Sequence, residues 1–71
     1  MRLGAQPRLL VLEARKGALA SEIQSLEVAV LALQQSGRPG VQLLDQLHHL
    51  QAELSEVTQE IDALRRIISE G

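Results

Sequence analysis

Three ionisable side chains stand at four-residue intervals in the second half of the chain: Asp45, His49 and Glu53. Residues four apart lie on one face of a helix, and carboxylate and imidazole groups are metal ligands, so this face could hold a metal ion. The same spacing is typical of an exposed polar face with intrahelical pairs. His48 and His49 are adjacent and would point about 100° apart, so they do not share a metal. We favour the polar face and expect neither a metal nor any other cofactor.

Four of the five serines are the next residues to consider for nucleophilic chemistry. A nucleophilic serine needs a base and an orienting group beside it, and no such arrangement is evident in the sequence. No glycine-rich loop follows a strand, so no phosphate-binding motif is present. We therefore expect the serines at helix surfaces and caps, and we expect neither enzyme activity nor a small-molecule substrate. The four are Ser21, Ser25, Ser36 and Ser55.

Composition excludes several other classes of protein. The 71 residues contain no cysteine and no aromatic residue, which removes a disulfide framework and stacking platforms for single-stranded nucleic acid. The net charge of −2 offers no basic footprint for nucleic acid. The longest apolar run, residues 28–33, is far short of the ~20 residues of a membrane span. The first ten residues lack the apolar run of a secretory signal, and we expect a cytoplasmic location.

Two long series of apolar residues recur at alternating steps of three and four. This spacing predicts two helices, each with one buried stripe, that pack like a coiled coil. The first series is interrupted once, at Lys16, and the second has no interruption. The first consists of Leu9, Leu12, Leu19, Ile23, Leu26, Val30 and Leu33, and the second of Leu43, Leu47, Leu50, Leu54, Val57, Ile61, Leu64 and Ile68.

A glycine-proline-glycine corner separates the two series. Gly37 is placed to end the first helix in a left-handed conformation, and Pro39 suits the first turn of the second helix. So short a connection joins antiparallel neighbours. The sequence thus predicts an all-α fold: residues 1–71 form one antiparallel two-helix hairpin, with helices at about 8–35 and 39–69, a corner at 36–39, and dimerisation or a partner completing the bundle.

A fold about residue 38 predicts which residues face each other across the hairpin. It places Lys16 beside Glu60, so the lysine either reaches that carboxylate or lies along the seam without a partner. The same register places four apolar residues in the middle of the seam. These are Ile23, Leu26, Leu50 and Leu54.

Seven apolar residues lie off both stripes and are left over by the hairpin. Apolar side chains that gather on an exposed surface mark an interaction site, so we expect a helix of another protein, a second copy of this chain, or both to cover them. Val28, Leu31, Val41 and Leu44 are expected to form a cluster at the corner end, and Leu10, Val11 and Ile67 a cluster at the open end.

The stretch SLEVAVLALQQSGRPGVQLLDQLHHLQAEL, residues 25–54, resembles the small helical-hairpin co-chaperones of type III secretion needle subunits. The resemblance lies in chain length and in two helices joined by a glycine-containing corner after a Leu-Glu-x-Ala-like run. It implies a hairpin that pairs with a tetratricopeptide-type chaperone and keeps a needle subunit unpolymerised in the cytoplasm. Val41, Gln42 and Leu43 stand where several members carry a tyrosine-bearing segment.

The leftover surface and the resemblance together predict a small protein-binding hairpin, an adaptor or co-chaperone in a protein assembly. One alternative is a purely structural coiled coil that dimerises into a four-helix bundle. A regulatory nucleic-acid-binding hairpin is less favoured, because the corner and second helix carry three arginines against six carboxylates.

Overall fold

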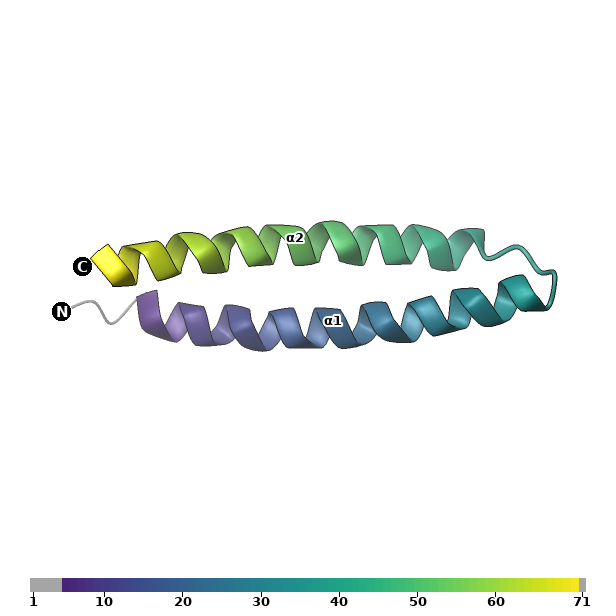
Figure 1. The fold of residues 1–71 in the computed structure, drawn as a ribbon, viewed down its shortest axis with the longest axis horizontal. Coiled ribbons are helices and arrows are strands. Elements are labelled where there is room, and N and C mark those ends of the chain that lie inside the picture. Colours follow the sequence, from purple (N-terminus) through teal and green to yellow (C-terminus); the bar gives the residue numbers. More distant parts are fainter. Residues whose placement is uncertain (1–4, 71) are drawn as a thin grey trace.

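A computed structural model describes residues 5–70 and shows two α-helices packed side by side. α1 (Ala5–Gln35) and α2 (Val41–Glu70) run antiparallel and form a rod of 56 × 14 × 14 Å (Figure 1). The all-α hairpin expected from the sequence is confirmed. Residues 1–4 and 71 of the expected single unit lie outside the described residues.

α1 begins three residues earlier than the sequence predicted, at Ala5 instead of about residue 8. The reason is the position of Pro7, which falls in the first turn of the helix. A backbone N–H in the first turn has no partner within the helix, so the proline loses no hydrogen bond there, and its fixed φ suits the helix. The helix then runs without interruption to Gln35.

The corner ends α1 in the way the glycine pattern predicted. Gly37 has a φ of 73°, the left-handed region that glycine adopts at little cost. Its N–H donates to the carbonyl of Gln34 at 3.1 Å, and the N–H of Arg38 donates to the carbonyl of Leu33 at 2.9 Å. These two bonds form a Schellman motif and satisfy carbonyls that the end of the helix leaves over.

α2 begins two residues later than predicted, so Pro39 precedes the helix and does not lie in its first turn. The first bond of the helix runs from the N–H of Leu44 to the carbonyl of Gly40, at 2.8 Å. The side chain of Leu33 lies over Gly40, where a Cβ would stand 3.4 Å from its Cδ1. Gly40 therefore both opens α2 and allows the end of α1 to approach it.

In the part of the chain that the structure describes, the buried residues all come from the two predicted stripes, but the core lies nearer the open end than expected. One cluster of buried side chains joins Leu12 and Leu19 of α1 to Val57 and Ile61 of α2. Of the four residues expected at mid-seam, Ile23 is buried, whereas the three leucines are only half-buried. The buried set is Leu12, Leu19, Ile23, Val30, Leu47, Val57 and Ile61.

Ion pairs between the helices define the two edges of the seam. On one edge, named edge 1, Arg8 pairs with Glu60 at 2.9 Å, and Arg15 pairs with Glu53. These residues repeat at intervals of seven, as expected for positions that flank a coiled-coil seam.

The opposite edge, named edge 2, carries the pair between Arg65 and Glu13 at 3.1 Å. The predicted contact between Lys16 and Glu60 is therefore wrong: Glu60 faces Arg8, and Lys16 is exposed. Among the described residues Lys16 has no ion pair.

The ion pairs also correct the register. The residue numbers of two paired residues average 34 on edge 1 and 39 on edge 2. The average for the contact of Leu33 with Gly40 lies between these values, at residues 36–37. The chain therefore folds back about residues 36–37 and not about residue 38. Compared with the predicted register, one helix is displaced along the other by about three residues, or ~4.5 Å. Figure 1 shows the result: α1 extends past the start of α2 at the corner, and α2 extends past the start of α1 at the open end.

Candidate protein-binding surface

The corner end of the hairpin exposes the apolar residues that the sequence singled out. Val28, Leu31 and Val41 are exposed, at 64%, 55% and 71% of their full accessible area, and Leu44 is half-buried beside them. Because Leu33 lies on Gly40, Leu31 is level with the first turn of α2, which carries Val41 and Leu44. We call these four residues the corner patch.

Most of the corner patch lies on edge 2. Positions separated by three, four or seven residues stay on the same side of a helix. Leu31 is four residues after Glu27, which is two heptads after Glu13. Leu44 is three heptads before Arg65, the partner of Glu13. Edge 2 thus carries an ion pair near the open end and apolar side chains near the corner.

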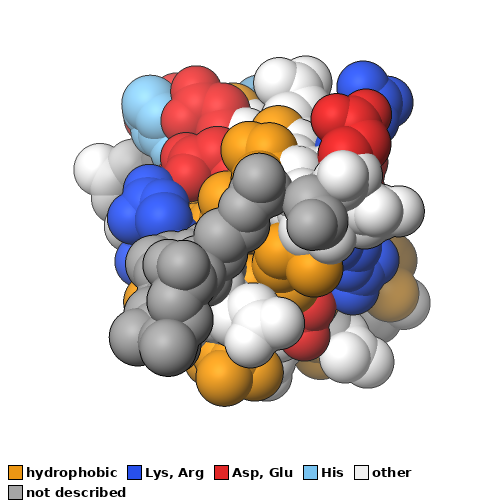
Figure 2. All heavy atoms as spheres, turned by 90° about the vertical axis from the view of Figure 1, so that its left-hand side faces the viewer, with side chains coloured by type: hydrophobic (Ala, Val, Ile, Leu, Met, Phe, Trp, Pro, Cys, Tyr) orange, Lys and Arg blue, Asp and Glu red, His pale blue; other side chains and the backbone are white. Residues whose placement is uncertain are grey.

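The predicted cluster at the open end is divided by the structure. Leu10 lies three residues before Glu13, on edge 2, whereas Ile67 lies one heptad after Glu60, on edge 1. Val11 is rotated by about 100° from Leu10, toward edge 1. Seen from the open end, hydrophobic side chains accordingly reach the surface on more than one side (Figure 2).

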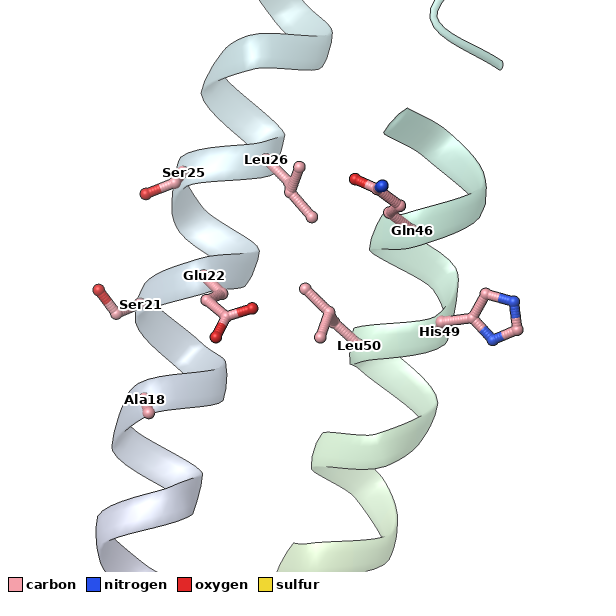
Figure 3. A pocket seen from close by; sticks show the side chains of 8 residues that line it. All are labelled: Ala18, Ser21, Glu22, Ser25, Leu26, Gln46, His49 and Leu50. Atoms are coloured by element: carbon pink, nitrogen blue, oxygen red, sulfur yellow. The ribbon is translucent and has the colours of Figure 1, made fainter. Parts of the chain in front are cut away.

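The structure also contains a hollow that the sequence analysis missed. An open hollow of about 780 Å³ lies between the helices near the middle of edge 1. Leu26 and Leu50 point toward each other across it, the carboxylate of Glu22 turns into it, and the ring of His49 points away (Figure 3). Its lining consists of Ala18, Ser21, Glu22, Ser25 and Leu26 of α1 with Gln46, His49 and Leu50 of α2.

One feature of the sequence indicates the hollow. Ala18, Ser21 and Ser25 are small residues at steps of three and four on one side of α1. Leu26 and Leu50, which line the hollow, are only half-buried. The apolar stripe alone could not reveal this, because it records which residues face the seam and not how well they are covered.

The three side chains of the hypothetical metal face, Asp45, His49 and Glu53, do not converge on one point. The Nε2 atom of His49 lies 3.7 Å from Oδ2 of Asp45, with both groups exposed. Glu53 turns instead toward Arg15 on the other helix. Among residues 5–70 no group of three or more His, Cys, Asp or Glu side chains is arranged to hold a metal ion.

Comparison with known proteins gives no match: no family model, no curated protein and no solved structure matches the chain. Within the described residues neither helix is long and apolar enough to cross a membrane. The findings that bear on function are therefore the hairpin and its exposed apolar residues. These residues are consistent with a role in binding another protein.

Proposed function

We propose that this chain is a small protein-binding helical hairpin that acts as an adaptor or co-chaperone in a protein assembly. The hairpin binds a helix of its partner through the corner patch, and none of its residues acts in catalysis. The observation that supports the proposal is the exposure of Val28, Leu31 and Val41 together at the corner end of the rod. Burial of each such side chain would contribute roughly 1.5–3 kcal/mol to binding before the costs of association.

The spacing of the patch suits a helical partner. Val28 and Leu31 are three residues apart on α1, as are Val41 and Leu44 on α2. Two such pairs at the same level form a shallow apolar face on which a third helix can lie, with its own apolar residues at steps of three and four. All four side chains of the patch are aliphatic, so its contacts with a partner are aliphatic.

The finer proposal is a co-chaperone of the type III secretion needle-subunit kind, and it rests on the resemblance of residues 25–54 and on the hairpin itself. In that setting the partner is a tetratricopeptide-type chaperone, and the hairpin acts in the cytoplasm. A cysteine-free chain is suited to that reducing compartment.

Replacement of Val28 and Leu31 by Glu tests the proposal. Both side chains are exposed, so the helical circular-dichroism signal should stay nearly unchanged while the complex with the partner is lost. The measurement is the mass of the protein purified from its native cell under mild conditions, by light scattering, with circular dichroism in parallel.

The matched control is Ala52→Glu combined with Gln59→Glu, which adds the same charge at two exposed positions of α2 away from the patch. This control should keep the complex. If the Val28→Glu, Leu31→Glu protein keeps both its fold and its complex, the corner patch does not bind the partner. If helicity falls together with the melting temperature, the patch closes the hairpin's own end.

A further inference from the structure

Edge 2 carries two opposite charges that form no ion pair within the described part of the hairpin. Lys16 follows Glu13 by three residues, and Glu27 follows Glu13 by two heptads, so both lie on the side of α1 that faces edge 2. Both are exposed, and neither takes part in an ion pair among the described residues. Lys16 also interrupts the apolar stripe, where a leucine would be expected from the pattern.

The apolar residues of edge 2 are arranged around the same centre as these two charges. Leu10 and Leu31 are exposed near opposite ends of the edge, and the point midway between them lies at residues 20–21. The point midway between Lys16 and Glu27 lies at residues 21–22. A single twofold axis through edge 2 beside Ala20 therefore places Leu10 against Leu31 and Lys16 against Glu27, each contact occurring twice.

We infer that a second copy of this chain covers edge 2, with the two hairpins antiparallel about that axis. The corner patch of each copy lies on Leu10 of the other, and Lys16 of each pairs with Glu27 of the other. An isologous interface must be self-complementary, and these two pairs of positions meet that requirement. This dimer rests on the proposed function, since the corner patch is part of its interface, and a second copy of the chain is the occupant.

The exposed area of the hairpin agrees with one interface of ordinary size. The accessible surface is 5364 Å² for a chain of 7.8 kDa. A compact monomer of that mass exposes about 4,400 Å², so the hairpin has an excess of roughly 1,000 Å². A standard interface takes about 800 Å² from each partner. Among the described residues, edge 2 also has a single ion pair between its helices, whereas edge 1 has two.

Charge exchange tests the pairing of Lys16 with Glu27. The purified wild-type chain should sediment at twice 7.8 kDa at high concentration. Lys16→Glu and Glu27→Lys, each made alone, replace two attractions by two repulsions and should weaken the dimer about tenfold or more. The two changes combined should restore the wild-type dissociation constant to within about threefold. The matched control is Glu22→Lys on edge 1, which should leave the dimer unchanged, and circular dichroism verifies the fold of each variant.

Disulfide formation tests the antiparallel arrangement, since the chain has no cysteine of its own. Ala20→Cys places the thiols beside the twofold axis and should link the two copies on oxidation. Leu31→Cys places them about 30 Å apart along the rod and should not, because each residue of helix rises ~1.5 Å. Self-linking through Leu31→Cys without linking through Ala20→Cys overturns the arrangement. A protein that stays monomeric at millimolar concentration also overturns the inference. If the chain is monomeric but the Val28→Glu, Leu31→Glu variant no longer binds another protein, the proposed function is still supported.

Discussion

Ile61 is the most deeply buried side chain of the hairpin, and its replacement tests the seam directly. It is 2% exposed and belongs to the cluster with Leu12, Leu19 and Val57. Ile61→Ala removes three carbon atoms, a transfer loss of about 2.4 kcal/mol at ~0.8 kcal/mol per buried methylene. The cavity left behind adds to this loss, and water entering from an open edge limits the addition. We expect the free energy of unfolding to fall by about 2.5–4 kcal/mol.

Ile67 provides a matched control, since it is the same residue type on the same helix but 47% exposed. Ile67→Ala should cost about 1 kcal/mol, because roughly half of the transfer loss is absent and little cavity forms. In a domain of this length 1 kcal/mol corresponds to ~4–8 °C, so Ile61→Ala should melt at least 10 °C below the parent.

The assay is thermal unfolding followed by circular dichroism at 222 nm, at one fixed protein concentration because association shifts stability by mass action. Equal losses for Ile61→Ala and Ile67→Ala would refute the seam described above. A larger loss for Ile67→Ala would mean that the helices pack through a different face.

Four further changes are predicted from local geometry, each measured by the same melts. Gly37→Ala should destabilise the hairpin by about 1 kcal/mol because its φ is 73°, whereas Gly17→Ala should stabilise it by up to about 1 kcal/mol, since an added Cβ there meets no atom within 4 Å. A gain at Gly37 or a loss at Gly17 would contradict this. Leu50→Ala should cost about 1–2 kcal/mol, less than a fully buried leucine, because the residue borders the hollow on edge 1; a cost above 4 kcal/mol would show that the hollow is closed in solution. His48→Gln with His49→Gln should leave the melting temperature unchanged, and added zinc should not distinguish this variant from the parent. A zinc-induced rise in the parent alone would reinstate the metal face.

Much of the fold could be predicted because its causes are local. The apolar steps of three and four specify two helices with one stripe each, and within residues 6–70 the seven buried residues all come from those stripes. Gly37 could be assigned to the left-handed end of α1 because the end of a helix requires a backbone conformation that glycine adopts readily. The exposure of Val28, Leu31 and Val41 followed from the same periodicity, since residues off the stripe face outward.

The edges of the hairpin were decided by contacts between residues far apart in the sequence. Neighbouring registers of two leucine-rich stripes bury similar apolar area, so the stripe pattern alone discriminates weakly between them. Leu33 lying over the bare backbone of Gly40 and the pairing of Arg8 with Glu60 fix the level of one helix against the other. That level places Leu26 and Leu50 on the two sides of the hollow on edge 1. The sequence thus determined which residues face the seam. The tertiary structure alone determined which residues meet across it, because that choice depends on side-chain volume and charge brought together from the two ends of the chain.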